Sequence, residues 1–313
     1  MKEKIKVIGV VGPTASGKTK LSIELAKVLD AEIVSADSMQ IYKEMSIASA
    51  KPTKEEMQGI RHHIIDIISL DENFSVYDYV NLAKKAIDDI IGRKKRVILC
   101  GGTGLYVDSL LNNTKFTDYD VDLELRDRLN KKAQELGGEE LLKELCEFDK
   151  EASQKIHPNN IKKIVRALEI YYTTQKSMTD HIKESHLEES PYESIMIGLN
   201  YRNRASLYDK INRRVDIMIE NGLIDESMGI FEKGYNSTSA AAIGYKELIP
   251  YFNGEVSMEE AISKIKQESR RYAKRQLTWF RRNQNINWLY IDDYNSFDLL
   301  KQSALDIIKS KLV

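Results

Sequence analysis

The chain has 313 residues, a net charge of −1, 42% hydrophobic residues and 30% charged residues, which is typical of a globular protein of one or two domains. It contains no apolar run of roughly 18 residues, so we expect no membrane-spanning helix, and the polar Met1–Lys4 segment leaves no room for a signal peptide. Two cysteines without paired spacing, Cys100 and Cys146, favour a reduced, cytoplasmic setting and argue against a cysteine metal site.

A phosphate-binding loop follows the first predicted strand. The β-branched run Ile5–Val11 precedes GPTASGKT at residues 12–19, and an amphipathic helix pattern begins near Leu21. Backbone N–H groups and the helix dipole favour an anion there, Lys18 adds a positive charge, and Thr19 offers a hydroxyl to Mg²⁺. We therefore predict that a di- or triphosphate group binds at Gly12, Pro13, Thr14, Ala15, Ser16, Gly17, Lys18 and Thr19, with Mg²⁺ as cofactor at Thr19.

A second predicted strand, residues 32–36, ends at Asp37. In a parallel sheet, ligands bind beyond the carboxyl ends of the strands, so Asp37 is expected on the same edge as the phosphate loop. Its carboxylate is suited to hold Mg²⁺ or to act as a general base. Asp is also a preferred helix N-cap, so the sequence leaves both interpretations open.

The next predicted elements are a strand at 64–68, a helix at 75–91 opened by Ser75 and Asp78, and a strand at 96–100. Residues 101–104, Gly-Gly-Thr-Gly, then form a second strand–glycine–helix junction. Thr103 would offer a hydroxyl near a ligand or simply cap a tight turn. His62 and His63 are adjacent, so on a strand they point to opposite faces, and we expect packing or a supporting contact from them rather than a metal site.

The composition changes near residue 117. Residues 118–194 have helical spacing and almost no strand signal before the sheet resumes at 195–199. We therefore predict an α/β fold with a parallel sheet, formed by residues 1–117 and 195–313, and an inserted all-helical domain at 118–194. The last third is predicted to be helical, with its longest helix at 258–282 opened by Ser257 and Glu260.

The segment 270–283 carries six basic residues, three aromatic residues and no acidic residue. This pattern is typical of phosphate-backbone contact combined with stacking, although a solvated helix face with its aromatics in the core would have the same composition. A weaker basic cluster, Lys162, Lys163 and Arg166, lies in the predicted insertion. From the residues alone, the chain is a P-loop phosphotransferase or a P-loop group transferase.

The motifs in chain order resemble a known family. They are GPTASGKT (12–19), DSMQIY (37–42), AKP (50–52), GGTGLY (101–106), RALEIY (166–171), IGYKE (243–247) and YAKRQLTWFR (272–281). Together they resemble the bacterial tRNA dimethylallyltransferases, also called tRNA isopentenyltransferases, over nearly the whole chain. The resemblance implies a P-loop NTPase-like core and the transfer of a dimethylallyl group from dimethylallyl diphosphate to N6 of the adenosine just 3′ of the anticodon, with release of diphosphate.

The resemblance also implies roles for individual residues. Asp37 is the expected general base, and Thr103 is expected to hydrogen-bond near the reacting centre. The implied partners are dimethylallyl diphosphate and the tRNA anticodon stem-loop, and we expect a monomer. The implied tRNA contacts are Asp37, Ser38, Met39, Gln40, Thr103, Arg126, Lys162, Lys163, Ile164, Val165, Arg166, Ala241, Ala242, Ile243, Gly244, Tyr245, Lys246, Lys274, Arg275, Gln276, Leu277, Thr278, Trp279, Phe280 and Arg281.

The chain departs from the family pattern at three places. Lys162-Lys163 stands where relatives often carry Gln-Arg, Gln175 stands where a Gly is expected, and Ala241-Ala242 replaces larger polar residues. Two rival functions share the phosphate loop. A nucleoside or nucleotide kinase would use ATP there but would not need the basic 270–283 segment. A non-catalytic P-loop RNA-binding protein would not need Asp37 and Thr103 near the loop.

Overall fold

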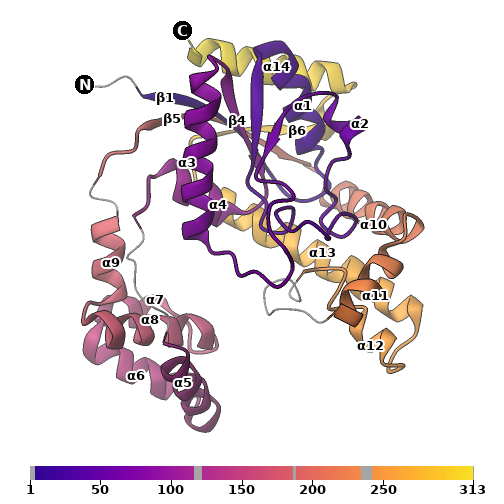
Figure 1. The fold of residues 1–313 in the computed structure, drawn as a ribbon. Helices are drawn as coiled ribbons and strands as arrows, with labels where there is room; N and C mark the ends of the chain where they lie inside the picture. The colour runs from indigo at the N-terminus through magenta and orange to yellow at the C-terminus, as the bar shows by residue number, and fades with distance from the viewer. Residues whose placement is uncertain (1–3, 116–121, 186–187, 234–241, 313) are drawn as a thin grey trace. The chain divides into compact units, whose positions relative to one another are not determined.

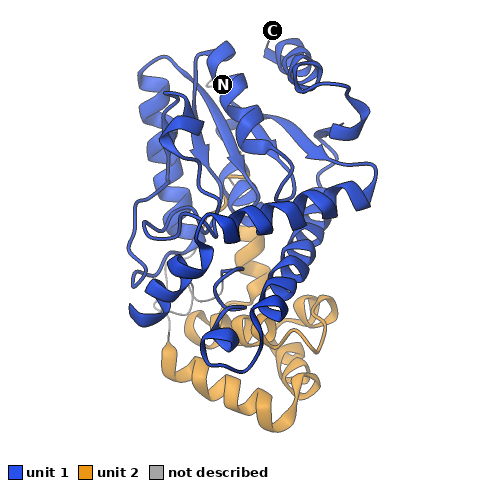
Figure 2. Cartoon of the chain, turned by 90° about the vertical axis from the view of Figure 1, so that its right-hand side faces the viewer, with its two compact units in different colours: residues 1–111, 191–313 blue, residues 112–190 orange. Residues whose placement is uncertain are grey.

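The computed structural model describes residues 4–115, 122–185, 188–233 and 242–312. It divides into two compact units, residues 1–111 with 191–313, and residues 112–190 (Figure 2). The larger unit contains a six-stranded sheet in the order β3-β2-β4-β1-β5-β6, and all neighbouring strands are parallel (Figure 1). Its strands are β1 (Ile5–Val11), β2 (Ala31–Ser35), β3 (His62–His63), β4 (Arg96–Gly101), β5 (Tyr192–Asn200) and β6 (Ile286–Tyr290). The predicted parallel α/β core is confirmed.

Helices cover both faces of this sheet because alternate strand residues are apolar on each face. Ile8 and Val10 of β1 pack in one cluster with buried residues of α1 and α14, whereas α3 and α4 contact the strands from the other side (Figure 1). The helices of this unit are α1 (Lys18–Leu29), α2 (Lys54–Met57), α3 (Val76–Gly92), α4 (Gly104–Leu111), α10 (Arg204–Glu220), α11 (Leu223–Lys233), α12 (Ile249–Phe252), α13 (Met258–Phe280), the 3₁₀ turn η2 (Ile291–Asp293) and α14 (Phe297–Leu312).

Two helix starts follow the side chains that predict them. Ser75 accepts from the Asp78 N–H and the Asp78 carboxylate accepts from the Ser75 N–H, which fixes the first turn of α3. Ser257 and Glu260 form the same reciprocal pair at α13. Across the part of the chain that the structure describes, no helix is both long and apolar enough to cross a membrane.

The smaller unit is helical throughout its described residues and has a core of its own. Its helices are α5 (Leu123–Leu136), α6 (Gly138–Phe148), α7 (Lys150–Lys155), α8 (Ile161–Thr174) and α9 (Met178–Ser185). Leu141, Leu145 and Ile164 are among the residues fully buried in that core. Helix α8 ends at Gln175 with φ +57°, a left-handed conformation that favours glycine, which gives a physical reason for the Gly expected at this turn.

Two strand predictions were wrong. The strand expected at 64–68 is instead the two-residue β3, because Ile64 and Asp66 both take a positive φ and turn the chain away from the sheet. Strand β6 lies in a region predicted to be helical, where it pairs with β5 from Met196–Ile286 to Asn200–Tyr290. A partner some ninety residues away in sequence therefore decides its conformation, and local propensity gives little sign of it.

The sheet brings three loops to one edge. Val11 at the end of β1 is paired with Gly101 of β4, and Ser35 of β2 is paired with Cys100. The phosphate loop, the Asp37 segment and the Gly-Gly-Thr-Gly turn therefore leave the sheet at nearly the same level. This is the edge at which parallel α/β sheets bind ligands.

Candidate active site

The phosphate loop passes from β1 into α1 through two glycines that no other residue replaces without strain. Gly17 has φ +77°, and a Cβ on Gly12, whose φ is +145°, would lie 2.4 Å from the Leu199 carbonyl oxygen. Within the loop, the Lys18 ammonium donates to the Pro13 carbonyl at 2.7 Å, and the Ser16 hydroxyl donates to the same oxygen at 2.8 Å. These bonds hold the loop against the N-terminus of α1, where backbone N–H groups are suited to bind an anion.

A cavity of about 290 Å³ opens beside this loop. Several parts of the larger unit contribute to it: the phosphate loop with the start of α1, the segment after β2, the end of β4, helix α10, the segment 242–246 and helix α13. Lining residues include Thr14, Lys18, Thr19, Asp37, Gln40, Ala48, Cys100, Arg214, Met218, Ile243, Lys246, Tyr272 and Arg275. The predicted convergence of Lys18, Thr19 and Asp37 is present, whereas Thr103 does not line the cavity.

Two cations face the Asp37 carboxylate in this cavity. Burial lowers the pKa of Lys18 to about 8, with the neighbouring Arg214 charge lowering it further and Asp37 opposing the shift. Burial also lowers the pKa of Arg214, again opposed by Asp37. Among the described residues, neither Lys18 nor Arg214 forms an ion pair, so both can receive an anion such as a diphosphate.

Sequence reasoning missed Arg214. It lies on α10 in register with the buried residues Leu207, Ile211 and Met218, three or four positions apart. A charged residue on an otherwise apolar helical stripe is costly to bury unless it serves a site or a partner. That interruption of the stripe was the available signal.

Asp37 shapes its own loop and remains open to the cavity. Its Oδ1 accepts from the Met39 N–H at 2.9 Å, which makes a local turn. No helix begins at Ser38, so the N-cap interpretation is wrong. Burial followed by the Asp37 charge raises the pKa of the neighbouring Tyr272 to about 12, so this phenol stays protonated at neutral pH. The carboxylate thus faces both cations and a neutral phenol.

Thr103 supports Asp37 through the backbone. Its hydroxyl accepts from the Ser38 N–H at 3.1 Å, and its N–H donates to the Ala36 carbonyl at 3.0 Å. Thr103 therefore holds the segment on either side of Asp37, with its hydroxyl on one side and its backbone N–H on the other. In this structure it acts as a positioning residue for Asp37.

The Gly-Gly-Thr-Gly turn is shaped by helix α13. A Cβ on Gly102 would lie 2.1 Å from the Gln276 amide nitrogen, and one on Gly104 would lie 2.2 Å from the Trp279 ring. Gln276 accepts from the Thr14 N–H at 2.8 Å and donates to the Gly102 carbonyl at 3.1 Å, while Trp279 donates to Asp108 at 2.7 Å. These glycines thus leave the space that the Gln276 and Trp279 side chains fill.

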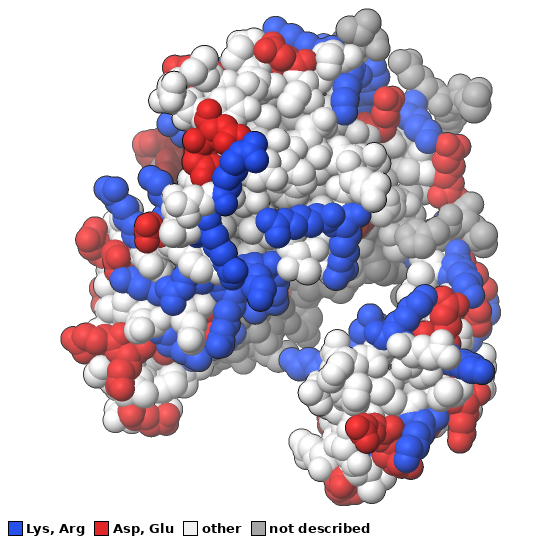
Figure 3. Space-filling model, turned by 180° about the vertical axis from the view of Figure 1, so that it is seen from behind, with Lys and Arg blue, Asp and Glu red and all other residues white. Residues whose placement is uncertain are grey.

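The residues predicted to contact tRNA in the larger unit differ in exposure, and the half-buried ones include Ser38, Met39, Gln40, Ile243, Leu277 and Trp279. Lys246, Lys274, Arg275, Thr278 and Arg281 are exposed, and in a view from behind, Lys and Arg side chains gather in a band across this unit (Figure 3). Ala242, Tyr245, Gln276 and Phe280 are buried, and Trp279 is bonded to Asp108. Direct RNA contact by the buried side chains is not supported, because these side chains lie in the core. Ala241 lies outside the described residues.

The smaller unit presents an arginine pair fixed by one carboxylate. Glu169 is fully buried, and its oxygens accept from Arg126 at 2.8 and 3.0 Å and from Arg166 at 2.9 Å. Lys162 and Lys163 are exposed on the same helix, whereas Ile164 and Val165 are buried in the unit's core. The basic positions of this segment can therefore reach a phosphate chain, and the two apolar ones cannot.

The adjacent histidines each have a supporting contact. His63 Nε2 lies 2.7 Å from the Glu32 carboxylate, and His62 Nδ1 lies 2.9 Å from the Ile60 carbonyl. Burial lowers the pKa of His62. Within the described residues, no cluster of three His, Cys, Asp or Glu side chains could hold a metal.

Comparison of the sequence with known proteins identifies the family. The sequence profile of the family described as IPP transferase matches residues 40–283, which is more than half of the chain. The chain belongs to the IPP transferase family. A protein named tRNA dimethylallyltransferase from Caldanaerobacter subterraneus subsp. tengcongensis is 49% identical, over 98% of this chain and 99% of its own length. One of the same name from Oceanobacillus iheyensis is 50% identical over 90% of each chain.

Solved IPP transferase structures share the fold. The full-length tRNA isopentenylpyrophosphate transferase of Bacillus halodurans is 44% identical, with a TM-score of 0.74 and coverage of 99% of this chain and 97% of its own. A eukaryotic dimethylallyltransferase described as acting on tRNA is 27% identical, with a TM-score of 0.80 and coverage of 98% and 80%. The predicted family membership and P-loop core are confirmed.

Proposed function

We propose that this protein transfers the dimethylallyl group of dimethylallyl diphosphate to N6 of the adenosine 3′-adjacent to the anticodon of tRNA. The observation that carries the proposal is that Lys18, Arg214 and Asp37 line one cavity beside the phosphate loop. Two cations suit a diphosphate leaving group, and a carboxylate suits the removal of a proton from an adenine amine. The relatives are named tRNA dimethylallyltransferase. The two cations suit the diphosphate of a dimethylallyl donor, and the carboxylate suits an adenosine of tRNA.

The reaction exchanges one bond for another. The allylic C–O bond breaks and its electron pair leaves with the diphosphate, while the N6 lone pair forms the new C–N bond. Lys18 and Arg214 stabilise the negative charge that develops on the leaving group. Asp37 accepts the proton that N6 loses, which restores a neutral amine.

Mg²⁺ fits the same cavity. Thr19 lines it, and its hydroxyl makes no hydrogen bond within the described residues. Mg²⁺ characteristically takes few protein ligands and completes its shell with substrate phosphate oxygens and water, so Thr19 would be its protein ligand. When bound, the ion neutralises charge on the diphosphate.

The reacting adenosine must leave the stacked anticodon loop to reach this cavity, as in other enzymes that modify a base. The exposed Lys274, Arg275 and Arg281 are suited to hold the RNA backbone while it does so, and Arg126, Lys162, Lys163 and Arg166 present further charge from the smaller unit. We propose that the protein acts as a monomer on the anticodon stem-loop.

The direct test is mass spectrometry of nucleosides from tRNA incubated with purified protein, dimethylallyl diphosphate and Mg²⁺. We expect an N6-dimethylallyl adenosine that is absent without the diphosphate donor and absent from a tRNA carrying guanosine at that position. ATP replaces the donor in a parallel reaction. Phosphate transfer from ATP, with no prenylated nucleoside in the first reaction, would favour a kinase and overturn the proposal.

A further inference from the structure

Two separate segments outside the phosphate loop contribute walls to the cavity. The first is the loop 38–50 after β2, which contributes Ala48, Ser49 and Ala50. The second is segment 242–246, which contributes Ala242, Ile243 and Lys246. Neither segment belongs to the sheet, so their relative position depends on contacts made elsewhere.

Glu226, in the first turns of α11, joins these two walls. Its carboxylate accepts the N–H groups of three consecutive loop residues, Ser46 at 3.0 Å, Ile47 at 2.8 Å and Ala48 at 3.1 Å. Its Oε1 also accepts the hydroxyl of the fully buried Tyr245 at 2.5 Å. Successive N–H groups turned toward one carboxylate form an anion-binding nest, here filled from within the protein.

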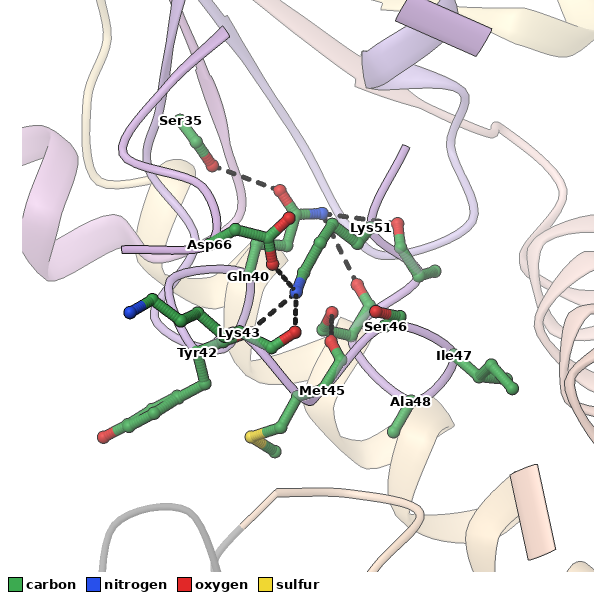
Figure 4. A network of polar contacts seen from close by, with 12 residues as sticks. Ser35, Gln40, Tyr42, Lys43, Met45, Ser46, Ile47, Ala48, Lys51 and Asp66 are labelled. Carbon is green, nitrogen blue, oxygen red and sulfur yellow. Dashed lines mark hydrogen bonds and ion pairs between the residues drawn. The ribbon is translucent and has the colours of Figure 1, made fainter. Parts of the chain in front are cut away.

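The surrounding contacts make this junction tight. Gly244, with φ +107°, lies against the loop, so that a Cβ there would be in van der Waals contact with the Ala48 Cβ at 3.4 Å. The loop is braced internally as well (Figure 4): Gln40 donates to the Ser49 and Ala50 carbonyls at 3.4 Å, and Lys51 donates to the Tyr42 carbonyl at 2.7 Å. The loop is thus braced from within, and its first part is also held by backbone bonds to residues 66–68. Glu226 anchors residues 46–48 to α11, on the same helix as Lys233, which pairs with Glu44.

We propose that Glu226 is a positioning residue that holds the two cavity walls in register, so that an entering nucleoside meets Asp37 in reactive geometry. The functional part of this inference rests on the proposed tRNA prenylation. Its carboxylate oxygens are occupied by four donors, so Glu226 acts through the loop and Tyr245. It takes no part in bond making.

The first experiment measures the clamp without any substrate. Amide hydrogen exchange is followed in the peptides covering residues 44–50 for the wild type, Glu226→Gln and Tyr245→Phe. Glu226→Gln keeps the side-chain shape but turns an NH₂ group toward backbone N–H groups, so exchange at 46–48 should accelerate. Glu232→Gln, an exposed change on the same helix, is the control. Unchanged exchange in the folded Glu226→Gln protein would overturn the clamp.

The second experiment measures its consequence for transfer. Misplacement of a reacting group by about 1 Å can cost about 10²-fold in rate, so Glu226→Gln should lower kcat by about that factor. KM for tRNA and affinity for inorganic diphosphate should stay unchanged, because the RNA-backbone contacts and the phosphate loop are intact. Tyr245→Phe, which removes only one of the four donors, should lower kcat less.

The two experiments distinguish failure of the positioning role from failure of the proposed reaction. Accelerated exchange with undiminished kcat in Glu226→Gln would reject the positioning role and leave the proposed reaction intact. Absence of prenylated nucleoside with the wild type would reject the proposed reaction, while the exchange result would still decide whether Glu226 holds the loop. A fall in diphosphate affinity equal to the fall in kcat would point to general loss of structure and also reject the inference.

Discussion

At the scale of single residues, the candidate site carries positive charge that a bound diphosphate would neutralise. Lys18 currently donates to a carbonyl of its own loop, and burial holds its pKa near 8. The neighbouring Arg214 is also without an acidic ion-pair partner among the described residues. An incoming diphosphate would supply the missing negative charge, so its binding should favour the protonated form of Lys18.

Lys18→Ala should therefore weaken both leaving-group stabilisation and diphosphate binding. We expect a loss of about 3 kcal/mol in kcat/KM for transfer. In the wild type, affinity for inorganic diphosphate should fall as pH rises through about 8, where Lys18 loses its proton; Lys18→Ala should lack this step. Calorimetric titration across pH, with Lys20→Ala on the same helix as control, measures it. Unchanged kinetics in folded Lys18→Ala would remove Lys18 from the site.

Asp37→Asn separates proton transfer from loop geometry. Asn can still accept from the Met39 N–H, so the local turn should persist, but it cannot take a proton from N6. We expect kcat to fall by ~10²–10⁴-fold with both substrate affinities nearly unchanged. Single-turnover transfer is followed across a Mg²⁺ titration. Near-full activity would exclude the general-base role, and recovery at high Mg²⁺ would instead make Asp37 a metal ligand.

At the scale of elements, α13 is the part against which the catalytic loops are fitted. Its buried Gln276 bonds the phosphate loop and the Gly-Gly-Thr-Gly turn together, and its Trp279 ring occupies the space above Gly104. The helix that carries the exposed basic residues on one face thus shapes the catalytic loops with the other. The motifs at 101–104 and 272–281 therefore depend on each other, because the glycines leave the space that the side chains of α13 fill.

Gly104→Ala tests that fit. The new methyl would overlap the indole of Trp279, which cannot move without breaking its bond to Asp108, so the free energy of unfolding should fall by about 1–3 kcal/mol. Gly229→Ala in α11 is the matched control, because nothing lies within 4 Å of that position. There, better helix propensity should add up to about 1 kcal/mol. Urea unfolding of both variants measures the difference, and equal stabilities would contradict the steric account.

The elements that could be predicted from sequence are those whose signals are local. Apolar runs marked β1, β2 and β4, and reciprocal capping pairs marked the starts of α3 and α13. Strand β6 depends on its pairing with β5, and the positive φ of Ile64 is imposed by its surroundings, so neither is visible in local propensity. Of the site, the phosphate loop and Asp37 came from motif and strand order. For Arg214 the only signal was the interruption of an apolar helical stripe, and Glu226 acts through tertiary placement.

At the scale of the whole molecule, the chain carries almost no net charge, so RNA affinity depends on where its cations are exposed. Arg275 lines the cavity and Arg281 is exposed at the end of α13, and neither has an acidic partner within the described residues. Arg275 therefore combines freedom from ion pairing with a place in the proposed site, and Arg281 extends the unpaired positive charge to the end of the same helix.

Replacing both Arg275 and Arg281 by Ala should weaken all tRNA substrates alike. If each contacts a phosphate, the slope of log affinity against log salt should fall by about one unit per contact. Binding is measured at several salt concentrations, with the exposed Lys309→Ala of α14 as control. A double variant that keeps the wild-type affinity and slope would exclude this patch from the RNA interface.

The bond between Thr14 and Gln276 spans 262 positions of the chain, which has a consequence for biosynthesis. During translation, the phosphate loop leaves the ribosome 262 residues before the glutamine that fixes it. Domains fold as units once their segments are available, so the nascent chain cannot hold a finished diphosphate site until α13 has been released. A polypeptide terminated before residue 258 would therefore lack the bond that fixes the phosphate loop and would not sequester the prenyl donor.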